Sequence, residues 1–355
     1  MFSKHAFLGP IILIALFAVG YPSFWLYSAA FGTSMVEDWI EKQRSNGFTI
    51  THGALVTSGF PFTVQITLAT PEATNAATGI SWQSSKLQLS LQPWNLRRFR
   101  IEAFGPQQIR YSDRTRAAGY TANASDIEAV AAIDEFGSLA AISVILNDIH
   151  LKGVGQGPLL QASQILADLK YPDSPPTVHN ESALEVSLAA NSIKTTALQT
   201  VVLGDTINNI RIKAEFLGPL SGHSVPNALS TWRRHGGTLE VHWLNMVWGA
   251  LDLRANGTVA LDPRMRPLGA LTADIRGYEE TLEALAEANL LSRDILPASR
   301  VALNLLAKTV KTETRPVLTV PITAQEGALY LGPIKLAELP VLFNVIQGRP
   351  SAQQD

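Results

Sequence analysis

The chain has 355 residues and a formal net charge of -2, so no basic field favours binding to nucleic acid. It contains no cysteine, which excludes disulfides, thiolate nucleophiles and zinc–thiolate sites. Charged residues make up 16% of the chain and hydrophobic residues 46%. This low charge indicates either a membrane segment or a sheet that is apolar on more than one face.

The N-terminal segment is strongly apolar. No charged residue lies between Ala6 and Gly32, and a helix of about 25 residues there would be roughly 37 Å long, enough to span a bilayer. An aromatic belt typical of a membrane interface follows at Tyr21, Trp25 and Tyr27. We therefore predict an uncleaved membrane anchor over residues 1–32. A signal peptide cleaved at Ser28-x-Ala30 is the alternative.

A short amphipathic helix is predicted at residues 33–47. Ser34 and Glu37 have the spacing of a capping box, which satisfies free N–H groups at a helix start. One face of this helix is apolar and consists of Met35, Val36, Trp39 and Ile40. Asn46-Gly47 ends the pattern. We expect the apolar stripe to pack on the sheet that follows, with a helix lying on the membrane surface as the alternative.

Residues 48–355 have the pattern of a β-rich domain. Apolar and polar residues alternate in segments separated by turn residues. The clearest segments are 63–68, 86–92, 183–189, 209–216, 250–255, 271–276 and 317–322. Short turns between strands favour antiparallel pairing, and Asn256-Gly257 predicts a tight hairpin turn. The predicted fold class is mainly β (α+β), a long curved antiparallel β meander with a few short covering helices.

Two helical patterns interrupt the strands near the C-terminus. Residues 278–291 place Tyr278, Leu282 and Leu285 on one side, and residues 297–310 begin with a proline, which suits a first helical position. We therefore predict a helical insertion at about 278–310. Because no long helix alternates with strands elsewhere, a parallel βαβ architecture is not expected.

The segment from Gly236 to Asp262 changes its apolar phase. Leu239 and Val241 first alternate with polar residues, as in a half-buried strand. The positions that were polar then become apolar at Leu244, Met246 and Trp248. A second apolar face would need a cover of its own.

Three interpretations of this change remain open. In the first, Asn245 marks a bend and the strand restarts near Val247 in a new register. In the second, the predicted helical pair covers the extra face and Trp248 belongs to the core. In the third, Leu244, Met246 and Trp248 line an open surface for an apolar ligand. These three residues are the candidate site residues of the sequence.

Residues with catalytic or metal-binding chemistry form no convincing constellation. The sequence has no nucleophile elbow, no His-Glu-x-x-His motif and no P-loop. His235 and His242 would lie on opposite faces of a strand, so no shared metal is expected. Residues 153–158 (GVGQGP) are typical of a turn. We predict no catalytic residue, no cofactor and no metal.

Two further charged pairs have a simple interpretation. Asp252 and Asp262 flank the predicted hairpin, and a solvated hairpin is favoured over a pair of catalytic carboxylates. Arg233-Arg234 offers two charges for a lipid phosphate, although a solvated turn is favoured.

The order of several segments is similar to that of a known family. The N-terminal half has an apolar anchor, then Gly59-Phe60-Pro61-Phe62 before a strand, Trp82 and a PWN motif at 93–95. The C-terminal third has the strands from Gly236, the helical pair, and EGALYLGPIKLAELPVL at 326–342. Over nearly the whole chain, this order resembles the domain-of-unknown-function family 2125 of Gram-negative bacteria. The resemblance implies a membrane-anchored envelope protein and carries no catalytic residues.

A more distant, fold-level likeness is to AsmA-type envelope proteins, some of which are thought to handle lipids. Together these features predict a single-pass inner-membrane protein with its body in the periplasm. The function expected first is non-enzymatic binding of lipid or another apolar ligand on the curved sheet. The alternatives are a scaffold or assembly factor that binds another envelope protein and, third, a hydrolase of envelope lipids or sugars.

Overall fold

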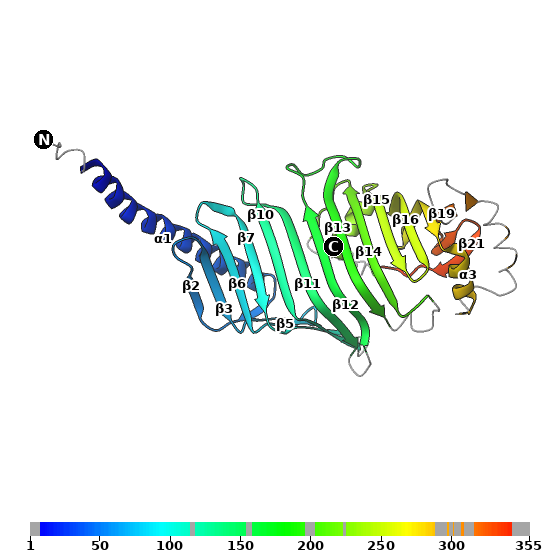
Figure 1. Cartoon of the computed structure of the whole chain (residues 1–355), viewed down its shortest axis with the longest axis horizontal. Coiled ribbons are helices and arrows are strands. Elements are labelled where there is room, and N and C mark those ends of the chain that lie inside the picture. The colour runs from blue at the N-terminus through cyan, green and yellow to red at the C-terminus, as the bar shows by residue number, and fades with distance from the viewer. Residues whose placement is uncertain are drawn as a thin grey trace, which may run out of the picture. The chain divides into compact units, whose positions relative to one another are not determined.

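In a computed structural model of the chain, the structure describes residues 8–113, 118–153, 158–195, 203–222, 225–287, 297, 301, 307–308 and 316–342. The described residues form 21 strands, assigned to one antiparallel sheet, and three helices (Figure 1). The predicted mainly β fold with a few short helices is therefore confirmed. The chain divides into two compact units, unit 1 (Met1–Gln164) and unit 2 (Ile165–Asp355).

Unit 1 contains one helix and the first eleven strands. Its elements are α1 (Leu8–Ser45), β1 (Thr49–Thr51), β2 (Leu55–Ser58), β3 (Val64–Ala69), β4 (Glu72–Asn75), β5 (Ile80–Gln83), β6 (Lys86–Gln92), β7 (Asn95–Phe104), β8 (Gln107–Asp113), β9 (Ala118–Ala124), β10 (Asp126–Ile133) and β11 (Leu139–Gly153). β12 (Pro158–Lys170) crosses the boundary between the units.

Unit 2 contains the remaining strands and two helices. Its elements are β13 (Ser182–Thr195), β14 (Thr206–Leu217), α2 (Val225–Arg234), β15 (Thr238–Trp248), β16 (Leu251–Leu261), β17 (Pro267–Arg276), α3 (Tyr278–Glu287), β18 (Ala307–Lys308), β19 (Val317–Gln325), β20 (Ala328–Leu331) and β21 (Ile334–Glu338).

The N-terminal helix is continuous. α1 runs through both the predicted anchor (1–32) and the predicted short helix (33–47), so the predicted start of a helix at Ser34 is wrong. The Ser34 hydroxyl instead lies 3.5 Å from the Asp38 carboxylate within the helix. A capping box acts only at the first turn of a helix, where N–H groups lack partners. Packing of α1 on the sheet on both sides of Ser34 keeps this residue inside the helix. The predicted end at Asn46-Gly47 is confirmed.

α1 approaches the sheet of unit 1 very closely. At Gly32 an added Cβ would lie 2.8 Å from Cδ1 of the buried Ile66, so a larger residue would require that side chain to shift. The Trp25 indole N–H donates to Thr63 O (2.8 Å), and the Tyr21 hydroxyl donates to Pro61 O (2.6 Å). These bonds fix the helix to the turn between β2 and β3.

Unit 1 is a meander of six long strands, five of which are interrupted. Each interrupted strand consists of two segments on either side of a break: β1 and β2, β4 and β3, β5 and β6, β8 and β7, and β9 and β10. The sixth strand, β11, has no break and pairs with both β10 and β9. The breaks lie at residues 52–54, 70–71, 84–85, 105–106 and 125. Because neighbouring strands break at the same level, the sheet bends along one line, which we name the crease (Figure 1).

Hydrogen bonds hold the crease together. The backbone N–H of Thr70 donates to Ser85 O across two neighbouring breaks (3.0 Å). The buried side chain of Gln107 donates through Nε2 to Ser84 Oγ (2.9 Å) and to Gly105 O (2.9 Å). The polar groups that the strand breaks release from the ladder are thus satisfied locally.

One face of the unit 1 sheet is covered by α1, and we name it the inner face. Paired residues of neighbouring strands share a face, so Ile50, Ala73, Trp82 and Ile109 form one inner row beyond the crease. The core between α1 and this face contains Trp25, Ala29, Ile40, Ile50, Val64, Ile66, Leu68, Leu89 and Leu91.

The core of unit 2 lies under α3. Its buried residues are Leu203, Leu251, Leu253, Ala255, Ala273, Ile275, Tyr278, Leu282, Ala284, Ala286, Leu318 and Val320. α2 joins β14 to β15 and was not predicted. Its buried Trp232 donates to Leu217 O (2.7 Å) and packs edge-on against Phe216.

A β-bulge explains the change of apolar phase in β15. Val241 pairs with Ala214 and Trp243 with Lys213, so His242 is an extra residue in the strand. The same irregularity separates Val241 from Leu244 in the pairing with β16. The bulge shifts the alternation by one residue, so the apolar residues before and after it lie on the same face. Of the three interpretations, the first is right that the register changes, but the change lies at His242–Trp243 within one continuous strand, and the bend at Asn245 with a restart near Val247 is wrong.

Two predictions about local structure are wrong. Asn256-Gly257 forms no hairpin, because β16 continues through it and pairs on both sides with β15 and β17. Gly257 has φ 151, and a Cβ there would collide with the carbonyl oxygen of Ala270. In the predicted helix 297–310, Pro297 and Val301 are helical, but Ala307–Lys308 form a strand that pairs with β19. Most of that helix and residues 288–291 lie outside the described residues.

Candidate apolar binding site

The three candidate residues of β15 belong to the packed core of unit 2. Leu244, Met246 and Trp248 are partly buried and pack against the cluster under α3. The Trp248 indole N–H donates to Gly204 O (2.9 Å). Their packing against this cluster, which includes residues of α3, agrees with the interpretation in which Trp248 belongs to the core.

An apolar groove lies in unit 1, between α1 and the inner face of the sheet. Its volume is about 260 Å³. The residues that line it are all apolar: Met35, Val36, Trp39, Ile40, Leu68, Leu87, Leu89, Phe99 and Ile101. Apart from the indole N–H of Trp39, the lining offers no hydrogen-bonding side-chain group, and such a site recognises a ligand by shape and burial of hydrocarbon.

Two elements of regular structure position the lining. On α1, Met35, Val36, Trp39 and Ile40 follow the spacing that puts residues on one helix face. On the sheet, Leu68 pairs with Leu87, and Leu89 pairs with Ile101, so their side chains form rows on the inner face. The groove is thus the space left where the helix stripe meets three strands.

Trp39 distinguishes the groove from ordinary core. Its neighbour Ile40 is buried, but Trp39 is 51% exposed although it carries one of the largest apolar side chains. A helix stripe that only packed on the sheet would bury such a ring. The exposed indole therefore extends the apolar surface of the groove toward the solvent.

The inner face stays apolar beyond the crease. Ile80, Ile109, Tyr111 and Tyr120 are each more than a third exposed. Lateral pairing places Tyr111 beside Tyr120, and their rings stack with centroids 6.4 Å apart. The inner face of the unit 1 sheet beyond the crease therefore offers further apolar surface on the same side as the groove.

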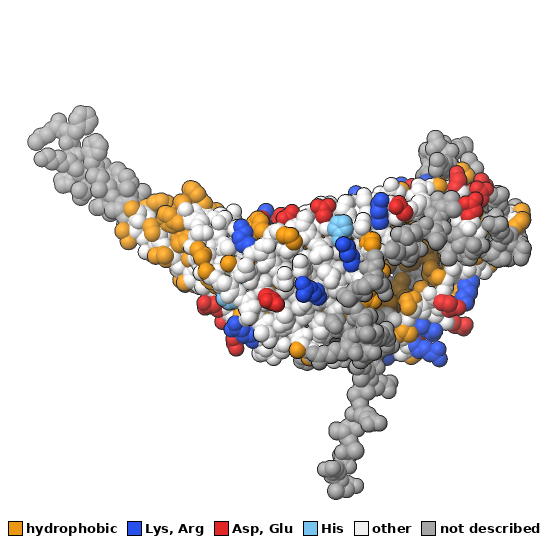
Figure 2. Space-filling model, turned by 90° about the horizontal axis from the view of Figure 1, so that it is seen from below, with side chains coloured by type: hydrophobic (Ala, Val, Ile, Leu, Met, Phe, Trp, Pro, Cys, Tyr) orange, Lys and Arg blue, Asp and Glu red, His pale blue; other side chains and the backbone are white. Residues whose placement is uncertain are grey.

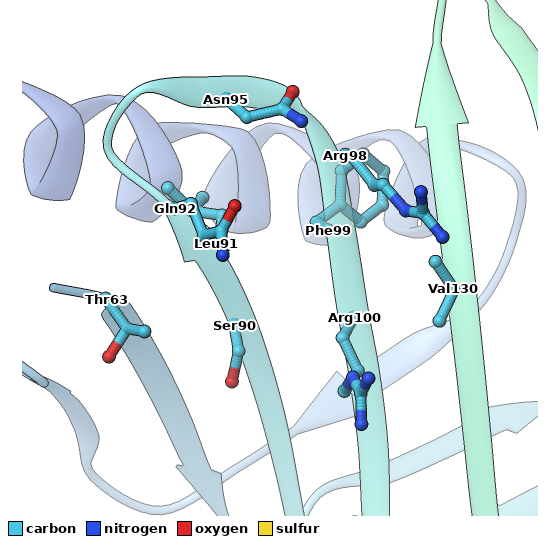
Figure 3. Close-up of a pocket in the computed structure, with 9 residues that line it drawn as sticks. All are labelled: Thr63, Ser90, Leu91, Gln92, Asn95, Arg98, Phe99, Arg100 and Val130. Carbon is cyan, nitrogen blue, oxygen red and sulfur yellow. The ribbon is translucent and has the colours of Figure 1, made fainter.

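A polar pocket of about 410 Å³ lies on the other face of the same strands (Figure 3). Ser90 and Arg100 line it and alternate with the groove residues Leu89 and Ile101. Arg100 forms an ion pair with Glu128 (3.1 Å). One side of these strands is thus hydrocarbon and the other is polar.

The remaining predicted pairs are not brought together as catalytic sites. His235 contacts Thr231 O (2.8 Å), whereas His242 contacts Glu215 (3.3 Å). Asp252 lies 3.8 Å from Arg276, and Asp262 lies 2.6 Å from Arg266. Each carboxylate therefore has a cationic partner.

The other singled-out segments have local roles or are not described. Arg233-Arg234 end α2 and do not form the predicted turn, and Arg234 donates to Thr231 Oγ1 (3.1 Å). Residues 154–157 of the GVGQGP segment lie outside the described part of the chain. Within that part, no three His, Asp or Glu side chains gather in a way that could hold a metal ion.

Sequence reasoning missed the groove but named four of its nine lining residues. The stripe of Met35, Val36, Trp39 and Ile40 was predicted to pack on the sheet; all but Trp39, which is 51% exposed, do so. The groove beside this stripe depends on how closely α1 approaches three strands that lie further along the chain.

Among the residues whose side chains are described, no helix has the length and apolar character needed to cross a membrane.

Comparison with known proteins identifies the family. The family model described as "Uncharacterized protein conserved in bacteria (DUF2125)" matches residues 25–340. No curated protein and no solved structure matches the chain. The match begins within α1 and ends after β21, so it includes the groove and both units. The chain therefore belongs to the DUF2125 family of bacterial proteins.

Proposed function

We propose that this protein binds a long hydrocarbon chain, such as the acyl chain of a lipid, in the groove between α1 and the sheet of unit 1. The observation that carries the proposal is a groove of about 260 Å³ lined by nine apolar residues and no polar one. Each methylene group that leaves water for such a site contributes about 0.8 kcal/mol. About six methylene groups would therefore contribute roughly 5 kcal/mol.

The same proposal includes attachment to a membrane, where such ligands are found. The sequence from Ala6 to Gly32 has no charge, and Phe17 and Val19 on α1 are 68% and 70% exposed. Figure 2 shows hydrophobic side chains gathered along the described part of α1. We place this part of the helix in the inner membrane and the body in the periplasm. Binding then needs no catalytic group, and the role is non-enzymatic.

The test compares two identical substitutions in the full-length chain. Val36→Phe adds volume to the groove lining without adding charge, whereas Val56→Phe adds the same volume on the exposed strand β2. Each protein is extracted in mild detergent, and its bound lipid is measured by native mass spectrometry. We expect the parent and Val56→Phe to retain lipid and Val36→Phe to lose most of it.

Two results would count against the proposal. One is a parent protein that is free of lipid in repeated preparations. The other is equal lipid retention by Val36→Phe and Val56→Phe when both are folded by circular dichroism. A discrete protein partner in place of lipid would favour the scaffold alternative.

A further inference from the structure

One edge of unit 1 carries exposed aromatic rings at three successive hairpin turns. The turns join β2 to β3, β6 to β7, and β10 to β11. β3 pairs with β6, and β7 pairs with β10, so the six strands are consecutive and their turns share one edge. We name this edge the aromatic edge, after Phe60 (54% exposed), Phe62 (69%), Trp94 (57%) and Phe136 (83%).

The geometry of the sheet places these rings along a line. Neighbouring strands lie about 4.8 Å apart, so successive hairpin turns are about 10 Å apart. Three turns therefore span about 20 Å. Because all four rings are more than half exposed, most of their surface is not buried in the core of unit 1.

α1 leaves the body of unit 1 at the aromatic edge. Tyr21 and Trp25 are hydrogen-bonded to Pro61 and Thr63 of the first turn, and the Phe60 ring lies 5.5 Å from the Trp25 ring. The part of α1 that precedes these residues extends beyond the sheet (Figure 1). The exposed apolar surface of the helix is therefore continuous with the aromatic edge.

Exposed apolar residues are concentrated in this region. In the described part of unit 1, the large hydrophobic side chains that are more than half exposed lie on α1, at the aromatic edge, or at Val56 of β2. Contiguous exposed apolar surface marks an interaction site. Trp and Tyr are enriched at the boundary between lipid headgroups and acyl chains, and exposed Phe side chains can bury their apolar surface in the same boundary.

Charge does not select the partner of this edge. Arg97 and Arg98 follow the Trp94 turn, and Asp134 and Glu135 lie in the Phe136 turn, so the charges balance. The Asp134 carboxylate accepts the backbone N–H groups of Phe136 and Ser138 (2.8 Å each) and so holds the turn. Any attraction must come from the aromatic rings.

We propose that the aromatic edge docks on the surface of a lipid bilayer, with its rings in the headgroup–acyl boundary. The inference rests on the proposed attachment through α1 and is independent of the groove. Attachment through α1 alone would let unit 1 tilt relative to the bilayer. Insertion of three hairpin tips into the interface would fix the orientation of its sheet relative to the membrane surface. Because insertion of rings drives the docking, it persists at high salt.

The absence of cysteine allows a direct test with single labels on the full-length chain. Phe62→Cys, Trp94→Cys and Phe136→Cys place an environment-sensitive fluorophore at each turn. His52→Cys, at an exposed position on the crease, is the matched control. The proteins are reconstituted into vesicles of equal parts phosphatidylcholine and phosphatidylglycerol. Quenching is measured with aqueous iodide and with spin-labelled acyl chains.

We expect iodide to quench the three edge labels several-fold less than the His52 label, in low and in high salt. Spin-labelled acyl chains should quench only the edge labels. Equal iodide quenching at all four positions on protein that floats with the vesicles would overturn docking and leave attachment through α1 intact. Protein that does not float with the vesicles would overturn both. Protection that disappears in high salt would contradict docking by the aromatic rings.

Discussion

Trp39 and Trp248 show how the same side chain has different roles in the two units. Trp39 is half exposed beside the groove, whereas Trp248 is partly buried against the unit 2 core and donates a hydrogen bond to Gly204 O. The sequence left Trp248 open between a core residue and a ligand contact, because it lies in a run of apolar residues. It packs against a cluster whose members include Leu203, Leu318 and residues of α3, and alternation alone cannot reveal contacts with such distant parts of the chain.

Trp248→Ala should lower the free energy of unfolding by about 2–4 kcal/mol, because it removes a ring that packs on the core. Urea unfolding followed by circular dichroism measures the loss. Trp243→Ala, at a more exposed ring of the same strand, is the control and should cost under about 1 kcal/mol. Equal losses for the two variants would show that Trp248 is not a core residue.

Asp262 makes stability depend on pH. Burial alone would raise its pKa, but the backbone N–H and guanidinium of Arg266 and the N–H of Arg264 outweigh it and lower the pKa. A carboxyl whose pKa is lower in the folded state stabilises the protein above its unfolded pKa. That contribution is lost as pH falls through the folded pKa.

Asp262→Asn should therefore destabilise the protein near neutral pH and have less effect in acid, below the lowered pKa. The measurement is the difference in free energy of unfolding between parent and variant across this pH range. Asp173→Asn, at an exposed position, is the control. A difference that is the same at neutral and acidic pH would mean that the ion pair with Arg266 is not responsible.

The elements show which sequence signals are reliable. Period-two alternation located eight of the 21 strands, among them β3, β6 and β14, because half-buried strands need one apolar face. The Asn-Gly hairpin signal at Asn256-Gly257 was misleading, since it is local and ladders on both sides keep β16 extended. The capping box at Ser34 was misleading for a similar reason, because α1 is held on the sheet before and after it.

The position of the bulge in β15 predicts which single-residue deletions the strand tolerates. Removing His242 would leave Val241, Trp243 and Leu244 in regular alternation, with the downstream side chains still facing the core. Removing Asn245 would turn Met246 and Trp248 to the other face. We expect the His242 deletion to fold and the Asn245 deletion to unfold, as judged by circular dichroism and urea titration. Similar behaviour of the two deletions would place the register change elsewhere.

Residues of α1 that precede the alternative signal-peptide cleavage site are part of the packed structure of unit 1. Trp25, Ser28 and Ala29 precede the predicted cleavage site and are buried in the unit 1 core. A chain that began at Phe31 would lose the Trp25 ring and its hydrogen bond to Thr63 O. We predict that such a chain is less stable by about 3–5 kcal/mol or more. Equal urea midpoints for the full-length and shortened chains would contradict this structural role of the segment.

At the scale of the whole molecule, the sequence predicted the meander but not its bends. The crease needs breaks at the same level in five long strands, and each break looks like an ordinary turn residue or proline when read alone. The groove needs α1 to lie across β3, β6 and β7, which join it only through tertiary packing. Composition indicated only that such a chain, with few charged residues, has more apolar surface than one sheet face can bury.

Our central claim, that the groove binds a hydrocarbon chain, is tested most directly by photo-crosslinking with a phospholipid that carries a diazirine on its acyl chain. The full-length protein in vesicles is irradiated and digested, and adducts are mapped by mass spectrometry. We expect adducts at residues 35–40 of α1 and at residues 87–101 of β6 and β7, with loss of these adducts in Val36→Phe. Adducts confined to residues before Tyr27, where α1 alone would meet the bilayer, would contradict the claim.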